Sequence, residues 1–456
     1  MASKVIDMTT GSPARHILQF AVPLICGYML QSMYQIIDAA IVGRFIGVDA
    51  LAAVGSSTSI TFLILGFCNG CCSGFAIPVA QSFGAGDYSS MRSYVSNAIR
   101  LSVVIAVIFT IVAATLCTPI LHMVQTPADV FGDAYIFLFI TVLSIPFIIA
   151  YNLLSSFMRS LGNSRIPFYF LILSSLINII LDFILIIEMK IGVEGAALAT
   201  MFSQALAAYW CYVYIKKNMH ILLPKGNECK YNKKQTLTLI NNGIPMGLQF
   251  SITAIGIIML QRANNALGTL YVATFVASLR VKYFFTCILE NLGVAMATYC
   301  GQNLGAKKIQ RISQGIRAAL KISVIYVIII VVIMYFFASD FTYLFVDPSQ
   351  TEIVKNSTMY LQINSYFYIL LGVLTVFRYS IQGLGYSNLS MCSGVAEMIA
   401  RTGISLWLVP ALGFLGVCLG DPTAWIFADM FLVPAGIILY HRLKKRMSQT
   451  ASPPTV

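Results

Sequence analysis

The chain has 456 residues, of which 58% are hydrophobic and 10% are charged, and its mean hydropathy is +0.82. This composition excludes a water-soluble globular protein and indicates a polytopic membrane protein. The net charge of +12 does not indicate nucleic-acid binding, because the basic residues lie in short segments between apolar runs. Alternating strands typical of a membrane barrel are absent from the sequence, so we expect an all-α fold.

Apolar runs of roughly 20 residues or more, separated by short polar segments, predict twelve transmembrane helices. Each run is long enough to cross the hydrocarbon core, and the first lacks the small-residue cleavage site of a signal peptide. The predicted spans are 17–43, 50–80, 95–118, 134–158, 166–187, 193–215, 236–262, 269–300, 314–338, 357–381, 388–409 and 413–440.

The distribution of basic residues predicts the orientation in the membrane. With the N-terminus in the cytoplasm, 22 of the 29 lysines and arginines fall on the cytoplasmic side, as the positive-inside rule requires. This count includes Arg378. Both termini are therefore expected in the cytoplasm, and the protein in the cytoplasmic membrane of the cell, surrounded by lipid and as a monomer.

An internal repeat divides the chain into two halves. Ala80–Ala85 recurs as Gly301–Ala306, and Leu161–Ser164 recurs as Leu384–Ser387, with a shared offset of 221 to 223 residues. Such a common offset indicates duplication. The expected parts are an N-lobe (1–215), a cytoplasmic inter-lobe loop (216–235), a C-lobe (236–440) and a cytoplasmic tail (441–456). Two six-helix bundles of the same topology would be related by an axis along the membrane normal.

The cysteines do not predict a disulfide framework or a zinc site. Their number, 11, is odd and most lie in apolar segments, so we expect buried, reduced thiols. Cys68, Cys71 and Cys72 have C-x-x-C spacing without a second such pair or a nearby histidine. Gly66, Gly70 and Gly74, at four-residue spacing beside them, favour close helix packing instead.

Asn178 and Asp182 lie four residues apart within the apolar run 166–187. In a helix these two side chains share a face. An acid within a membrane span is costly unless it meets a cation, a proton or a polar partner, so Asp182 is a functional candidate.

Asp38, Asp182 and Thr200 are predicted at one depth, since each is six residues from a charged residue at the outer end of its span. At 1.5 Å per residue this is roughly 9 Å inside the extracytoplasmic boundary. Their oxygens suit a small cation such as Na⁺, or carboxyls that share a proton. Apart from Arg100, near the inner end of the third span, the N-terminal spans contain no lysine or arginine to neutralise these acids. The alternative is that Asp38 pairs with Arg44 and Asp182 only accepts bonds from its neighbours.

The second half lacks this acidic pair and has other charges. Glu397 and Arg401, four residues apart with the acid first, predict an ion pair within one helix. Glu290 is expected either to contact a cationic substrate or to pair across helices with Lys282 or Arg401.

The first two predicted helices resemble those of the multidrug and toxic compound extrusion (MATE) family. The resemblance rests on Pro23, Gln31, Tyr34–Asp38, Val42–Gly47 and Ala50–Ala53, followed by Gln81-x-x-Gly84-Ala85, and covers nearly the whole chain. It implies two six-helix lobes that export organic, often cationic, compounds in exchange for H⁺ or Na⁺, without any other cofactor. The DinF-like branch is implied by an N-lobe cation site that matches Asp38, Asn178, Asp182 and Thr200.

The resemblance also suggests residues that line a substrate cavity and a hinge. Gln31, Tyr34 and Gln35 are expected in the cavity of the N-lobe, and Arg280, Lys282 and Glu290 in that of the C-lobe. Pro23 removes a backbone hydrogen bond from the first helix and so permits bending.

Two alternatives to an exporter of organic compounds remain at this stage. A flippase for lipid-linked sugars or lipids would use basic cavity residues, for which Arg280 and Lys282 are available. An intramembrane transferase would need clustered catalytic groups, but the four histidines lie near the ends of the spans, so we do not expect an enzyme. A phosphate-binding GxxxxGK[ST] motif is absent as well.

Overall fold

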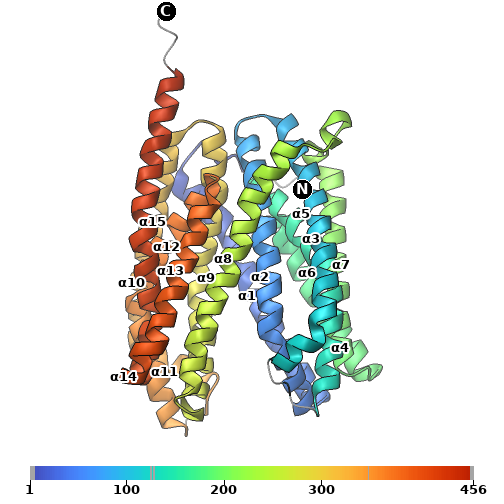
Figure 1. Cartoon of the computed structure of the whole chain (residues 1–456), viewed down its shortest axis with the longest axis vertical. Helices are drawn as coiled ribbons and strands as arrows, with labels where there is room; N and C mark the ends of the chain where they lie inside the picture. The colour runs from blue at the N-terminus through green and yellow to red at the C-terminus, as the bar shows by residue number, and fades with distance from the viewer. Residues whose placement is uncertain (1–5, 124–125, 127–128, 348, 452–456) are drawn as a thin grey trace, which may run out of the picture. The chain divides into compact units, whose positions relative to one another are not determined.

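The computed structural model describes residues 6–123, 126, 129–347 and 349–451, without the side chains of 39, 48, 49, 51–53, 55–60, 62, 123, 450 and 451. The regular elements of these residues are helices (Figure 1). The longer ones are α1 (Pro13–Phe45), α2 (Val48–Gly84), α3 (Tyr88–Met123), α4 (Phe131–Leu143), α5 (Ile145–Ser160), α6 (Arg165–Asp182), α7 (Val193–Asn218), α8 (Lys233–Asn265), α9 (Thr269–Gly305), α10 (Ile309–Tyr343), α11 (Thr351–Tyr366), α12 (Tyr368–Gly383), α13 (Ser387–Gly403), α14 (Val409–Leu412) and α15 (Phe414–Ala451), with short helices η1 (Phe183–Glu188), η2 (His220–Leu222), η3 (Gly226–Cys229) and η4 (Ile404–Leu408).

The predicted all-α membrane fold is confirmed. In the described part of the chain nine helices are long and apolar enough to cross a membrane, or up to eleven when two bent helix pairs are counted as single spans. The predicted sixth span, 193–215, is helical in α7 but is not among these candidates. Its alanines are interrupted by the polar residues Thr200, Ser203 and Gln204.

Two of the predicted spans are broken by a bend. The span at 134–158 consists of α4 and α5, which meet at 41°, and the span at 357–381 consists of α11 and α12, which meet at 50°. The first break lies at Ser144, followed by Pro146 in the first turn of α5, and a proline removes one helical hydrogen bond. The second lies at Phe367 without a proline, at the position that the repeat predicts.

Further irregular features recur at the offset of the sequence repeat. The π-helix η1 begins at Phe183 and its counterpart η4 begins at Ile404. Left-handed glycines occur at Gly162 and Gly192 in the first half and at Gly385 and Gly413 in the second. Because these departures from regular helix are rare, their recurrence supports a structural duplication.

Two compact units are present in the described chain, and their boundaries differ from those of the predicted lobes. Unit 1 comprises residues 6–7 and 22–247, and unit 2 comprises 8–21 and 248–451. The start of α1 therefore belongs to unit 2, and the start of α8 belongs to unit 1. Two of the three boundaries, at 21/22 and 247/248, fall close to Pro23 and Pro245. These prolines lie 222 residues apart, which is within the offset of the repeat.

In unit 1 the start of α8 packs closely against α2. A Cβ atom at Gly70 would lie 2.6 Å from the carbonyl oxygen of Met246, and one at Gly74 would lie 2.5 Å from the Cα of Gly243. The predicted packing role of these two glycines is therefore confirmed. The neighbouring cysteines are buried free thiols, whereas three others in the described chain are exposed, namely Cys26, Cys229 and Cys392.

The segment before α8 is fixed to α3 within unit 1. Arg92 donates two hydrogen bonds to Glu228, of 2.6 and 2.7 Å, and the backbone N–H of Asn232 donates to Asn97 at 3.0 Å. The Arg92 guanidinium lowers the pKa of Glu228 to about 2, because the hydrogen bonds favour the ionised carboxylate. This contact explains why the beginning of α8 belongs to unit 1.

The segment before α1 is fixed in the same way within unit 2. Asn303 donates to the carbonyl oxygen of Met8 at 3.1 Å, and Lys308 to that of Thr9 at 2.9 Å. Arg311 donates to the carbonyl oxygens of Met8, Thr10 and Gly11. Side chains of α9 and α10 and of the turn between them thus satisfy the backbone that leads into α1.

Candidate functional site

Unit 1 brings together side chains from three helices at the predicted N-lobe site. Asn178 and Asp182 belong to the last turns of α6 and are 2% and 0% exposed. The side-chain amide of Asn178 donates to the hydroxyl oxygen of Thr200 on α7 at 3.4 Å. The helix face that the sequence predicted for Asn178 and Asp182 is therefore buried, and it meets α7.

Asp38 on α1 lies next to Asp182 on α6. The two carboxyl groups are close enough for the charge of each to act on the other. Two like charges at this distance in a buried site repel strongly, so a proton or a cation stabilises the pair.

The oxygens of this site have few donors. Both carboxylate oxygens of Asp182, Oδ1 of Asp38 and Oδ1 of Asn178 are buried and accept no hydrogen bond from the described residues. None of the ion pairs among these residues involves Asp38 or Asp182, so the alternative pairing of Asp38 with Arg44 is not found. These four oxygens, from α1 and α6, accept no hydrogen bond and can therefore bind a proton or a monovalent cation.

Tyr34 lies one turn before Asp38 on α1 and within the influence of both acids. The side chains of Gln31 and Gln35 and the charges of Asp38 and Asp182 act on its hydroxyl. The three residues predicted for the N-lobe cavity are thus placed together beside the acidic pair. Gln35 is exposed and Gln31 is half-buried. Their role in contacting a substrate remains a prediction.

A π-helix directly follows Asp182. Asp182 is the residue before η1, and the N–H of Phe183 bonds to the carbonyl oxygens of Ile179 and Ile180. The wider turn rotates the side chains that come after it around the helix axis. Such π-turns are often found at functional sites. The sequence predicted an ordinary helix here, and no residue in the segment signalled the wider turn.

In unit 2 the structure reveals a network of buried charges that the sequence predicted only in part. The expected pair of Glu397 and Arg401 is confirmed at 3.1 Å. Asp421 pairs with Lys282 at 2.5 Å and with Arg401 at 3.0 Å. Arg378 also pairs with Glu397. The assignment of Arg378 to a cytoplasmic loop is therefore wrong, because it is 5% exposed within α12.

The remaining predicted C-lobe residues are not gathered at one place. Glu290 is half-buried and accepts a hydrogen bond of 3.5 Å from the hydroxyl of Tyr379. The expected ion pair of Glu290 with Lys282 or Arg401 is not found among the described residues, because these cations are held by other acids. Arg280 is exposed and lines a hollow of about 650 Å³ between the start of α9 and the side chains of Phe345, Val346 and Ile353.

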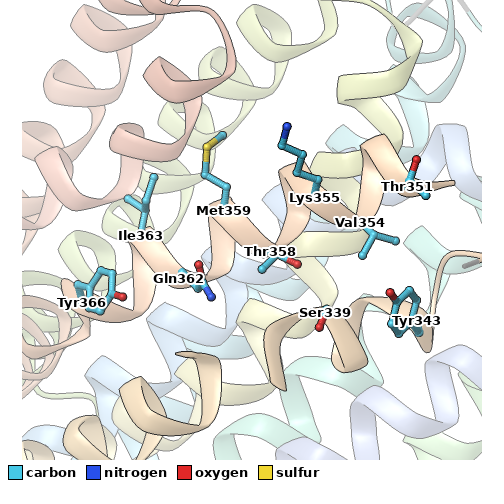
Figure 2. Close-up of a pocket in the computed structure, with 10 residues that line it drawn as sticks. All are labelled: Ser339, Tyr343, Thr351, Val354, Lys355, Thr358, Met359, Gln362, Ile363 and Tyr366. Atoms are coloured by element: carbon cyan, nitrogen blue, oxygen red, sulfur yellow. The ribbon is translucent and has the colours of Figure 1, made fainter. Parts of the chain in front are cut away.

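A second hollow in unit 2, of about 510 Å³, lies between α10 and α11. Figure 2 shows its lining, in which Lys355 and Met359 of α11 extend away from Ser339 and Tyr343 of α10. None of the predicted site residues lines it. Its single charged side chain is Lys355, so the hollow gives no grouping of chemical groups comparable to that in unit 1.

Comparisons with known proteins identify the family. The profile of the MatE family matches residues 23–184 and 244–407. The probable multidrug resistance protein YoeA of Bacillus subtilis (strain 168) is 26% identical over 94% of both chains. The multidrug export protein MepA of Staphylococcus aureus (strain MRSA252) is 23% identical over 95% of both. Both are named for drug resistance or export, and neither as an enzyme.

A solved structure described as the outward-facing conformation of a multidrug resistance MATE family transporter of the MOP superfamily has the same fold. Its TM-score is 0.90 at 20% identity, and the match covers 97% of this chain and 99% of that one. The family profile extends over both halves of the repeat, and the relatives match over nearly their full length. The chain is therefore a polytopic membrane protein of the MatE family.

Proposed function

We propose that this protein exports organic, often cationic and lipophilic, compounds in exchange for H⁺ or Na⁺ by alternating access. The observation that carries the proposal is the contact between Asp38 and Asp182, beside the oxygens of Asn178 and Thr200. No basic side chain is ion-paired to these acids in the described chain. Their charge is therefore available to an ion from solution.

Binding of the coupling ion removes the repulsion within the acidic pair, and its release restores that repulsion. An ion that binds one conformation of the transporter more tightly than another shifts the population toward the first. One charge moving through 100 mV releases about 2.3 kcal/mol, which corresponds to a concentration ratio of roughly fifty-fold. One or two ions per cycle suffice for export without a nucleotide.

Pro23 is the proposed hinge through which the site acts on α1. It lies inside α1, where it removes one backbone hydrogen bond. The boundary between the two units falls between residues 21 and 22, directly before this proline. A helix that belongs to two compact units needs a point where it can bend, and a proline offers this with little loss of bonding.

The flippase alternative is less favoured by the geometry. It needs Arg280 and Lys282 to bind a phosphate group, but Lys282 is buried in its pair with Asp421. Displacing that carboxylate would leave a buried acid with one cation fewer, which is costly. We further propose a monomer in the cytoplasmic membrane with both termini in the cytoplasm, as the basic residues indicate.

Drug resistance of cells that express single variants tests the proposal. Asp38→Asn and Asp182→Asn should reduce resistance to that of cells without the transporter, while the amount of protein in the membrane stays unchanged. Asp133→Asn, which changes an exposed acid in the first turn of α4, is the matched control and should retain resistance. Full resistance with either site variant would remove the coupling role of these acids.

A further inference from the structure

The charged groups that act on one another in unit 2 do not balance. The acids are Glu290 on α9, Glu397 on α13, and Asp421 and Asp429 on α15; the bases are Lys282 on α9, Arg378 on α12 and Arg401 on α13. If every group were ionised, four negative charges would face three positive ones. In a low-dielectric interior an uncompensated charge is expensive, so one acid is expected to bind a proton or a cation.

Two of the four acids form ion pairs with all three bases. The oxygens of Asp421 accept hydrogen bonds from Lys282, from Arg401 and, at 3.2 Å, from the hydroxyl of Tyr360. The oxygens of Glu397 accept from Arg401 and Arg378. Both carboxylates are therefore stabilised in their charged form, and neither needs a proton.

Asp429 has no such donors. It is 9% exposed, and both of its carboxylate oxygens are buried without a hydrogen-bond partner among the described residues. The charged groups that act on it come from two helices packed against α15, namely Arg378 of α12 and Glu397 of α13. The same two groups act on Glu290, together with the hydroxyl of Tyr379 and the thiol of Cys287.

The difference between the last two acids decides which one carries the proton. Glu290 is half-buried, receives a hydrogen bond from Tyr379, and faces Arg378. Asp429 is more deeply buried and receives none. With Glu290 ionised and Asp429 neutral, three acids match three bases.

We propose that Asp429 binds one exchangeable proton and forms a second protonatable site, in unit 2, that is independent of Asp38 and Asp182. The ligand is a proton rather than a metal ion. The Arg378 guanidinium acts on the site and repels cations, and the described residues contain no group of three or more His, Cys, Asp or Glu that could hold a metal. On deprotonation, Asp429 would compete with Glu397 for Arg378.

Infrared spectroscopy of the purified full-length protein tests this directly, because a protonated carboxyl has its own C=O stretching band. Asp38→Asn with Asp182→Asn forms the background, which removes the signal of unit 1. A protonated-carboxyl band should persist there at pH 7 and should shift in D₂O. It should be lost when Asp429→Asn is added, and retained when Glu352→Gln, an exposed acid at the start of α11, is added instead.

A second variant examines the charge balance without removing Asp429. Glu290→Gln leaves three acids for three bases, so the proton on Asp429 should dissociate at a lower pH and the band should disappear earlier in a titration. Asp429→Glu should move the band rather than delete it, which controls for misfolding of the asparagine variant. No band in the background, a band insensitive to Asp429→Asn or to D₂O, or an unchanged midpoint in Glu290→Gln would each overturn the proposal.

Discussion

Asp182 is fully buried, and neither of its carboxylate oxygens accepts a hydrogen bond from the described residues. The sequence predicted this environment because an acid in an apolar run has few local partners, and its spacing from Asn178 fixed a common helix face. The proximity of Asp38, on another helix, was expected because Asp38 and Asp182 were predicted at the same depth in the membrane. Such matching works where helices cross a layer of known thickness.

The partners of Lys282 and Arg378 could not be predicted in this way. Lys282 meets Asp421 and Arg378 meets Glu397 across different helices, and which helix faces which is decided by packing rather than by spacing along the chain. The pair of Glu397 and Arg401 was predictable because both belong to one helix, four residues apart. The spacing of residues along the chain therefore predicts contacts within a helix but not contacts between helices.

Gly162 allows a prediction about backbone strain. It has a φ of +85°, and a Cβ atom there would lie 2.2 Å from the carbonyl oxygen of Ile6. Gly86, with a φ of +72° and nothing within 4 Å of such a Cβ, is the matched control. Gly86→Ala should cost roughly 1 kcal/mol through the left-handed backbone alone, and Gly162→Ala should cost clearly more through the added clash.

Thermal unfolding of the detergent-purified variants measures this difference. The melting temperature should fall further for Gly162→Ala than for Gly86→Ala. Equal decreases would show that the chain at Ile6 moves away from the added methyl group without cost.

At the scale of single elements, the positions of the helices could be predicted from the sequence better than their internal irregularities. The bend between α4 and α5 has a signal in Pro146, but the larger bend between α11 and α12 has none. The π-helices η1 and η4 also lack a local signal. These features depend on how each helix packs against its neighbours, which hydrophobic patterning does not describe.

Pro23 in α1 gives a prediction at this scale. Pro23→Ala restores a backbone hydrogen bond, and proline in a helix interior costs about 3 kcal/mol. The variant should fold at least as stably as the wild type but export substrate roughly tenfold more slowly, because the stiffer helix resists bending. Pro119→Ala, in the interior of α3, should leave export unchanged. Export at the wild-type rate by Pro23→Ala would argue against the hinge.

The contact of Glu228 with α3 gives a prediction about pH. Its pKa is about 2 in the folded protein and about 4.3 in an unfolded chain. A lowered pKa stabilises the folded state above the unfolded value, and this stabilisation is lost as the pH falls from about 4 toward 2. Hydrogen exchange of residues 226–236 should therefore be slower in the wild type than in Glu228→Gln at neutral pH.

The difference in exchange between the two proteins should shrink in acid, because protonated Glu228 resembles glutamine. The two proteins are compared at each pH. If their difference in hydrogen exchange stays constant down to pH 2, the ion pair with Arg92 does not fix this segment.

On the scale of the whole molecule, the repeat was visible in the sequence and recurs in the bends, the π-helices and the left-handed glycines. The acids of the candidate site are not repeated. At an offset of 222, Asp38 corresponds to Leu260 and Asp182 to Ile404. A duplicated fold thus carries one acidic pair in unit 1 and a different set of charges, mostly paired, in unit 2. The coupling of transport to an ion is therefore predicted to depend on unit 1.

Transport into lipid vesicles, with sodium and pH gradients imposed separately, tests this central claim most directly. The wild-type protein should accumulate a cationic dye under at least one of the two gradients, by roughly fifty-fold for each charge that moves through 100 mV. Asp38→Asn and Asp182→Asn should accumulate none under either gradient, because the amides cannot bind and release the coupling ion. Gradient-driven accumulation by either variant at the wild-type level would contradict the account.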